Sequence, residues 1–375
     1  MSNKISSFDR VKKAINFKYP DRVPIMHAIL PGAWYKHGDD LYKIVKRYPS
    51  DISTNNLRLS SKRTAAGGYS ISDEIARRYI YEDDFGYIEP RNFMYGPDGV
   101  KGRKQDEWDC VWKKSDPGIV GQIVVHPLAD WENWKSYRFP DPLAYWRWDK
   151  EEFMGQIEES KKLEKYIIGY AGNLFEKMQW LRGYEQLMVD IAANQNRVEM
   201  LADKITEYII CTIDKLAEFG IDGVMLTDDW GTQSSLMIAP NVWQKLFKPY
   251  YKKIFKEIHK FGMDVHFHTD GNTIDIISDL IEVGADVINP QFSAMNLKEL
   301  GEIVKDNVCI RTDIDRQYML VKATPKEMYE YVKVAFDILG SEKGGIIACG
   351  ELNSDCSLNV VEAMYKSFEK YGRYY

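Results

Sequence analysis

Short apolar runs alternate with longer amphipathic segments along most of the chain. Eight of these runs contain few polar residues and are rich in Ile and Val: 22–29, 51–56, 166–172, 223–228, 264–269, 286–291, 308–313 and 344–349. A short run that is apolar at consecutive positions is typical of a strand buried on both faces. The sequence therefore predicts eight buried strands of the kind found in parallel sheets.

The segments between the later strands have the periodicity of helices. Apolar residues recur every three or four positions over 198–219, 240–258, 274–283 and 326–339, and Gly or Pro stands at several of the expected ends. Regular alternation of strand and helix predicts an α/β fold. Eight such units predict a (β/α)8 TIM barrel.

One stretch interrupts this alternation. Residues 60–150 contain many aromatic residues, Gly and Pro but little helical periodicity, and 106–112 has the pattern of a short antiparallel strand. No flexible linker rich in Ser and Gly separates this stretch from the rest. We therefore expect a single barrel domain over residues 1–375, with an inserted cap region after the second strand at about residues 60–150.

Composition and charge exclude several classes of protein. The net charge of −6 and the pI of about 5.7 argue against a general affinity for nucleic acid or an anionic membrane. No apolar run is long enough to span a bilayer, and the first residues lack the apolar region of a signal peptide. The five cysteines are scattered, which is typical of reduced thiols. We expect a cytoplasmic protein with no nucleic-acid and no membrane partner.

Polar residues that follow the predicted strands are candidates for a functional site, because barrel enzymes form their active sites at the carboxyl ends of the strands. These residues are His27, Asn55, Asn56, Tyr170, Asn173, Asp228, Asp229, Trp230, Gln233, His268, Asp270, Asn289, Gln291, Asp313, Asp315, Cys349 and Glu351. Those expected to bind the substrate are His27, Tyr170, Trp230, Gln233, Asn289 and Gln291.

The segment from His268 to Asp270 places an imidazole and a carboxylate, two potential metal ligands, close together in the sequence. Zinc binds imidazole nitrogen, carboxylate oxygen and thiolate sulfur, and a catalytic zinc site leaves one position open. His268, Asp270 and Cys349 would supply three such ligands. In the alternative interpretation His268 is a hydrogen-bonded barrel histidine and Cys349 is a small buried apolar residue. Cys356, beyond the last predicted strand, is the rival thiol.

The pair Asp228 and Asp229 also admits two interpretations. One carboxylate either binds or protonates the substrate beside Trp230, or it caps the following turn while the other is solvated. Adjacent residues of a strand point to opposite sides, so at most one of the two is expected to face the site.

A series of motifs occurs in order along nearly the whole chain: Asp21-Arg22-Val23-Pro24, Leu181-Arg182-Gly183, Gly220-Ile221-Asp222-Gly223, Asp228-Asp229-Trp230-Gly231, Pro240 with Trp243, Pro249-Tyr250, His268-Thr269-Asp270-Gly271-Asn272, Asn289-Pro290-Gln291, Asp313-Ile314-Asp315 and 350–359. In this order they resemble the uroporphyrinogen decarboxylase superfamily. The resemblance implies a (β/α)8 barrel, in agreement with the strand pattern.

Within that superfamily the chain is more similar to the zinc methyltransferases that work with corrinoid proteins than to the decarboxylases. Decarboxylases hold a polycarboxylated tetrapyrrole with an Arg-rich segment after the first strand, whereas residues 30–35 contain no Arg. The coenzyme M methyltransferases carry His-x-Cys-Gly-Asn and a later Cys. His268, Asp270 and Cys349 stand at the corresponding positions, with Asp270 in place of a thiolate.

The resemblance implies a methyltransferase that uses Zn2+ held by His268, Asp270 and Cys349. It would move a methyl group between a small O-methyl (or N-methyl) substrate and the cobalt of a corrinoid (cobalamin). No Asp-x-His-x-x-Gly corrinoid motif occurs in the sequence, so a separate corrinoid protein is the expected partner. A site with one thiolate favours demethylation, with Asp228 or Asp229 protonating the leaving atom.

Two alternatives remain at this point. A metal-free decarboxylase would need cationic groups for the substrate carboxylates, and Arg58, Arg63, Arg182 and Arg311 are the candidates. The other alternative is a barrel that binds a ligand without turning it over.

Overall fold

The computed structural model describes residues 5–53, 102–114, 121–143 and 150–373. The strands of the described part are β1 (Ala28–Ile29), β2 (Ile52–Ser53), β3 (Gly102–Gln105), β4 (Val111–Lys114), β5 (Gln122–Val125), β6 (Tyr166–Gly172), β7 (Gly223–Thr227), β8 (Asp264–Thr269), β9 (Val287–Pro290), β10 (Cys309–Arg311), β11 (Ile346–Ile347) and β12 (Glu351–Leu352). The predicted site positions Asn55 and Asn56, and the cations Arg58 and Arg63, lie outside these ranges.

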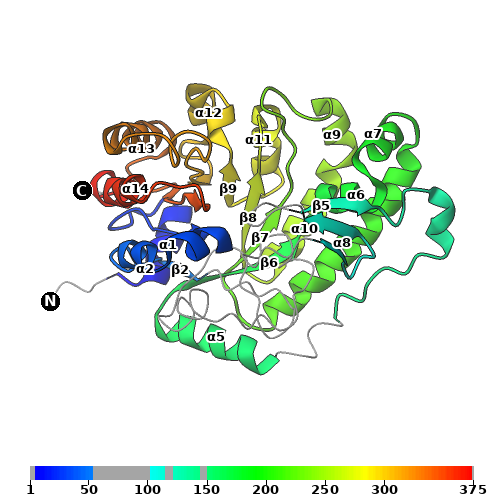
Figure 1. The fold of residues 1–375 in the computed structure, drawn as a ribbon, viewed down its shortest axis with the longest axis horizontal. Coiled ribbons are helices and arrows are strands. Elements are labelled where there is room, and N and C mark those ends of the chain that lie inside the picture. Colours follow the sequence, from blue (N-terminus) through cyan, green and yellow to red (C-terminus); the bar gives the residue numbers. More distant parts are fainter. Residues whose placement is uncertain (1–4, 54–101, 115–120, 144–149, 374–375) are drawn as a thin grey trace.

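Helices surround the strands (Figure 1). They are α1 (Ser7–Ile15), α2 (Pro31–Val45), α5 (Lys150–Lys162), α6 (Phe175–Arg182), α7 (Tyr184–Ala193), α8 (Gln195–Ala217), α9 (Pro240–Leu246), α10 (Lys248–Lys260), α11 (Ile274–Glu282), α12 (Leu297–Val304), α13 (Pro325–Leu339) and α14 (Leu358–Tyr371). Within the part of the chain that the structure describes, none of them is both long and apolar enough to cross a membrane.

Seven strands form a curled parallel sheet in the order β11-β10-β9-β8-β7-β6-β2. The segment leading into β1 closes this sheet. On one side the N–H of Asp51 donates to the carbonyl of Ile25 at 2.8 Å; on the other side the N–H of Met26 donates to the carbonyl of Ala348 at 2.9 Å. We call this closure, at Ile25 and Met26, the seam of the barrel. Beyond the seam, β1 pairs in parallel with β12. The predicted α/β barrel is thereby confirmed.

The first strand is shorter than the sequence predicts. Regular pairing is limited to Ala28–Ile29, whereas the apolar run covers 22–29. Pro24 has no N–H to donate, and the N–H of Ile25 donates to the side chain of Asp51 at 2.8 Å instead of to a neighbouring strand. The carboxylate of Asp51 therefore takes the place of a backbone acceptor from a neighbouring strand where the barrel closes.

The predicted insertion contains an antiparallel sheet, β3-β4-β5. Its middle strand begins at Val111 and not at the predicted residue 106, because Asp106 accepts hydrogen bonds from the N–H groups of Trp108 and Cys110 and forms a turn. Residues 60–101 lie outside the described part, so the boundaries of the insertion stay a prediction.

Successive residues of the barrel strands belong to two separate buried clusters. Ile288 and Ile310 pack in the large cluster, which also contains apolar residues of the surrounding helices, whereas Val287, Cys309 and Cys349 pack in a smaller one. This alternation is expected when one side of each strand faces the helices and the other faces the barrel interior. Cys349 thus points into the barrel.

Candidate functional site

Two loops at the carboxyl ends of β7 and β8 lie against each other and build the site. The N–H of Gly231 donates to the carbonyl of Asp270 at 3.0 Å, and the N–H of Asn272 donates to the carbonyl of Thr232 at 2.7 Å. Gly271 has a φ of +79°, and a Cβ on Gly231 would lie 2.6 Å from the backbone of the facing loop. Two glycines are therefore required for this close approach.

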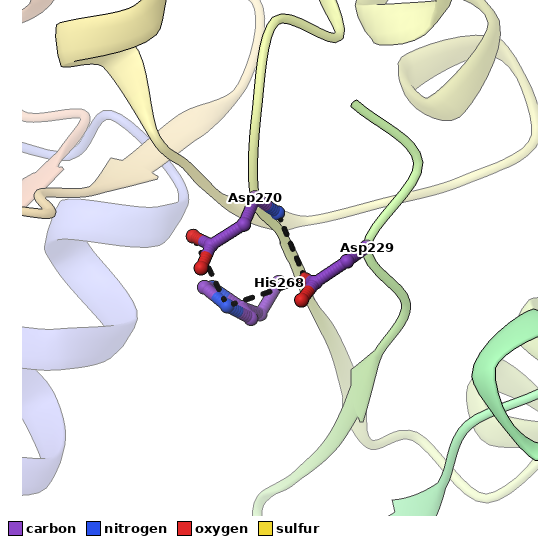
Figure 2. A group of neighbouring side chains, drawn as sticks. All are labelled: Asp229, His268 and Asp270. Carbon is purple, nitrogen blue, oxygen red and sulfur yellow. Dashed lines mark hydrogen bonds and ion pairs between the residues drawn. The ribbon is translucent and has the colours of Figure 1, made fainter. Parts of the chain in front are cut away.

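The loop contact brings Asp229 to His268 and Asp270 (Figure 2). One potential ligand atom from each of the three lies within 4.8 Å of the other two. His268 Nε2 is 3.5 Å from an oxygen of Asp270 and 3.8 Å from an oxygen of Asp229, separations that are too long for hydrogen bonds. The N–H of Asp270 donates to Asp229 Oδ1 at 3.0 Å and holds that carboxylate in place.

The carboxylate of Asp270 has one occupied and one free oxygen. Arg316 Nη2 donates to Oδ2 at 2.6 Å, whereas Oδ1 is buried and has no hydrogen-bond partner. Arg316 also donates through Nη1 to Glu351 at 2.8 Å, and its Nη2 lies 3.6 Å from Asp313. One guanidinium thus links three carboxylates that come from different strand ends.

The charges of the cluster shift its pKa values. Burial lowers the pKa of His268, but Asp270 and Asp229 outweigh burial and raise it above its ordinary value. Burial would raise the pKa of Asp270, but His268 and Arg316 hold it below the ordinary value. Burial, together with the charge of Asp270, raises the pKa of Asp229. The geometry therefore favours an ionised Asp270 beside a cationic partner.

Asp228 is not part of the cluster. Its oxygens accept hydrogen bonds from the N–H groups of Leu174 and Glu176 and from the hydroxyl of Tyr251, each at 2.8 Å, and the residue is 1% exposed. It holds the start of α6 against β7, and burial raises its pKa to about 7. Asp229 is thus the aspartate of the pair that lies in the cluster, which agrees with the expectation that at most one of the two faces the site.

Two predicted substrate-binding residues lie in the core. Trp230 is 0% exposed, stacks on Phe175 and donates through its indole N–H to Tyr251. His27 is also buried, and its Nε2 donates to the carbonyl of Tyr48 at 2.7 Å. Large aromatic rings and a satisfied imidazole pack well there, and contact of these two residues with a substrate stays a prediction.

The other four predicted substrate-binding residues take different positions. Tyr170 is partly buried, with its hydroxyl 3.1 Å from that of Thr227. Gln233 is exposed on the loop after β7. Gln291 accepts a hydrogen bond from the N–H of Gly271 at 2.8 Å, and Asn289 contacts His268. Gln291 and Asn289 therefore support the end of β8 and the loop that follows it, and their direct contact with a substrate stays a prediction.

The predicted thiolate ligand does not join the cluster. Cys349 is 4% exposed, its N–H donates to the hydroxyl of Thr312, and burial raises the pKa of its thiol to about 12. Among the described residues, the group that could hold a metal consists of Asp229, His268 and Asp270. Cys356 is likewise buried. Whether Cys349 is a ligand stays a prediction.

Sequence reasoning missed Glu176 and Arg316. Glu176 lies in the first turn of α6 and accepts a hydrogen bond from Asn173; burial raises its pKa well above the ordinary range, and the charges of Asp229 and Asp228 add to the shift. Arg316 lies three residues after Asp313 in a loop. Glu176 could have been predicted from its position shortly after the end of β6, whereas no sequence pattern indicates that Arg316 lies in the site.

A model of the family described as Uroporphyrinogen decarboxylase (URO-D) matches residues 121–371. The chain is also similar to a protein named methylcobamide:CoM methyltransferase MtbA from Methanosarcina acetivorans. The two are 24% identical over 232 residues, which cover 60% of this chain and 64% of the relative. The match thus spans less than two thirds of that relative's length.

The fold is similar to the solved structure of a methyltransferase from Methanosarcina mazei. The TM-score is 0.64 at 14% sequence identity, and the alignment covers 98% of this chain and 99% of that one. This likeness extends over the whole barrel and agrees with the closure of the sheet described above.

Proposed function

The chain belongs to the uroporphyrinogen decarboxylase (URO-D) family, and from this premise we propose that it is a zinc-dependent methyltransferase. It would move a methyl group between a small O-methyl, or less favourably N-methyl, substrate and the cobalt of a separate corrinoid protein. The observation that carries the proposal is the cluster of Asp229, His268 and Asp270 at the carboxyl end of the barrel. Similarity to a methylcobamide:CoM methyltransferase supports the reaction class.

The residues of the cluster fit a metal ion. Asp270 Oδ1 is buried without a hydrogen-bond partner, and His268 Nε2 faces it at a distance too long for a hydrogen bond. Such an unsatisfied carboxylate oxygen beside an imidazole nitrogen is costly unless a cation binds between them. His268 and Asp270 are the ligands on which the sequence and the geometry agree. Asp229 is the third ligand that the geometry favours, and Cys349 is the one that the sequence favours.

Bound zinc would supply Lewis acidity toward an oxygen or nitrogen of the substrate. Oxygen and nitrogen ligands make a harder site than a set of thiolates does, which supports an O-methyl substrate over a thiol. Burial and the neighbouring carboxylates Asp229 and Asp228 raise the pKa of Glu176 well above the ordinary range, which favours its protonated form. We assign it as the acid that protonates the leaving atom, in place of Asp228, whose oxygens are occupied by three donors.

The decarboxylase alternative is less well supported. Arg182 is buried against Asp190, Arg311 is buried inside the barrel, and Arg316 is already paired with carboxylates. Arg182 and Arg316 are thus paired with carboxylates of the protein and Arg311 is buried, which does not suit a polycarboxylated substrate.

Elemental analysis and methyl transfer test the proposal. Wild-type protein is expected to contain about one zinc per chain, and His268→Ala should lose both zinc and methyl transfer to or from cobalamin while the barrel stays folded. His259→Ala is the matched control, because that exposed histidine pairs with Asp286 outside the site. Wild-type protein that binds no zinc, or a His268→Ala variant with unchanged transfer, would contradict the proposal.

A second pair of variants identifies the third ligand. Asp229→Ala is expected to lose zinc, because the carboxylate already lies beside His268. Cys349→Ser tests the thiolate, since serine is a poor zinc ligand near neutral pH, and Cys356→Ser is its control. Loss of zinc in Cys349→Ser alone would replace Asp229 by the thiolate as third ligand.

A further inference from the structure

Arg311, the last residue of β10, is a buried cation that the proposed reaction does not use. It is 6% exposed, and its Nη2 donates to Asn289 Oδ1 at 2.6 Å. Its Nη1 lies near the sulfurs of Met225 and Met26, which are weak acceptors, and its Nε has no hydrogen-bond partner. Burying a guanidinium with so few oxygen acceptors is costly, so it calls for a role beyond packing.

The partners of Asn289 fix the orientation of its side-chain amide. Nδ2 donates to the carbonyl oxygens of Arg311 at 2.8 Å and Thr312 at 3.3 Å, and Oδ1 accepts from the guanidinium. A guanidinium has no acceptor. A flipped amide would turn its NH2 group toward the guanidinium and its oxygen toward two carbonyl oxygens. The side chain is thereby restricted to one orientation, with Oδ1 facing Arg311.

That orientation determines which nitrogen of His268 carries the proton. Nδ1 lies 2.8 Å from Asn289 Oδ1 and 3.1 Å from the carbonyl oxygen of the same residue. Both partners only accept hydrogen bonds, so Nδ1 must donate and the lone pair of the neutral ring is on Nε2. Nε2 is the nitrogen that faces Asp270 and Asp229.

We propose that Asn289 and Arg311 are positioning residues, which together hold the His268 ring with its proton on Nδ1 and with Nε2 turned toward the two carboxylates. The inference rests on the metal site proposed above and deepens it. Asn289 supplies the acceptor, and Arg311 keeps that acceptor from rotating away. A metal ligand that is already in the required tautomer and orientation binds more tightly, because no rearrangement accompanies binding.

The tautomer is measured on the zinc-free protein. Long-range 1H–15N correlation spectra of histidine-labelled protein, at an alkaline pH where the ring is neutral, should show His268 protonated at Nδ1, with the signal assigned by its loss in His268→Gln. Asn289→Ala should populate the other tautomer. Asn289→Asp retains the acceptor for Nδ1 but loses the donor to the two carbonyl oxygens, so it should keep the Nδ1 tautomer at a cost in stability.

Zinc affinity is the second measurement. By competition with a chelator, Asn289→Ala is expected to bind zinc about 10- to 100-fold more weakly. Arg311→Met should weaken binding in the same direction, and Asn289→Asp, which keeps the acceptor for Nδ1, should bind zinc more tightly than Asn289→Ala does. Asn296→Ala, which removes the N-cap of α12 away from the site, is the control for reduced stability and should bind zinc as wild type does.

The two measurements separate this inference from the proposed function. If wild-type protein binds no zinc, the function fails, while the tautomer spectra still judge the positioning role. If zinc binds, but Asn289→Ala changes neither the tautomer nor the affinity, the positioning role is overturned and the function stands.

Discussion

At the scale of single residues, two carboxyl groups beside Arg316 have pKa values shifted in opposite directions: that of Asp270 is lowered and that of Asp313 is raised. Arg316 holds Asp270 ionised through a 2.6 Å contact. Asp313 is 5% exposed, and its Oδ2 lies 3.6 Å from the same guanidinium without a hydrogen bond. Burial raises the pKa of Asp313 to about 7 even though Arg316 opposes the shift. The difference between the two carboxylates thus comes from hydrogen-bond geometry as well as from charge.

Asp313→Asn is expected to flatten the pH dependence of stability of the zinc-free protein. The folded carboxyl titrates near pH 7 and the unfolded one near 3.8. The stability that its protonated form contributes is therefore fully present below the unfolded pKa, and it is lost as the pH rises through the folded pKa. The slope reaches at most about 1.4 kcal/mol per pH unit. Urea unfolding of both proteins across this pH range measures it, and equal slopes would contradict the prediction.

Single residues also show where sequence reasoning reaches its limit. His268 and Asp270 could be predicted because both stand at the end of one strand, where their spacing sets their side. The choice between Asp228 and Asp229 depends on which of two adjacent side chains turns inward. The N–H groups of Leu174 and Glu176, at the start of α6, bind Asp228 and so decide between the two. This contact joins segments far apart in the sequence, so no local pattern predicts it. The path of the loop with Arg316 is equally non-local.

At the scale of elements, the β7 and β8 loops depend on the contact between Gly231 and Gly271. Gly271→Ala places a methyl group against the backbone of Gly231 and is expected to disrupt both the loop pair and zinc binding. Gly262→Ala is the matched control, because that glycine has a similar φ of +72° but nothing within 4 Å of an added Cβ. The control should cost about 1–2 kcal/mol from backbone strain alone.

Unfolding free energy and zinc affinity of the two variants check this expectation. A larger loss of stability in Gly271→Ala, together with weakened zinc binding, is the expected result. If both variants lose the same stability and bind zinc equally, the loop contact does not control the site.

The elements themselves were predictable to different degrees. Strands β6, β7, β8 and β9 coincide with apolar runs, because burial on both faces leaves a continuous pattern. The length of the first strand was overestimated. An apolar run cannot show that the N–H of Ile25 donates to the carboxylate of Asp51 instead of to a neighbouring strand. The predicted helix over 240–258 is divided into α9 and α10 near Phe247, where Pro249 prevents a continuous ladder.

At the scale of the whole molecule, a buried ion network closes the barrel seam opposite the site. Asp51 is 1% exposed and accepts from Arg10 at 2.7 Å, from Arg22 at 2.8 Å and from the N–H of Ile25. Asp51→Ala would leave the buried N–H of Ile25 without its acceptor and Arg10 with Asp21 as its remaining carboxylate partner, at a cost of about 1–3 kcal/mol. Zinc affinity of the folded variant should not change, because Asp51 precedes β2 and the site follows the strands.

Denaturant unfolding measures this cost against Asp40→Ala. That variant removes an ion pair with Lys43 in which both side chains are 70% exposed and solvent screens the charges, so the change should be much smaller. A similar small effect in Asp51→Ala would show that the seam does not depend on the carboxylate.

The same closure has a consequence for the order of folding. β7 and β8 are consecutive strands, so Asp229, His268 and Asp270 meet by pairing of neighbouring segments, whereas the seam joins Ile25 to Ala348 across most of the chain. Long loops close at a higher entropic cost, and distant pairings form more slowly. The candidate ligands are therefore expected to assemble on an open sheet before the barrel closes. A metal ion present during synthesis would then bind the candidate ligands in this open intermediate, and it would favour the folding pathway in which these ligands stay together.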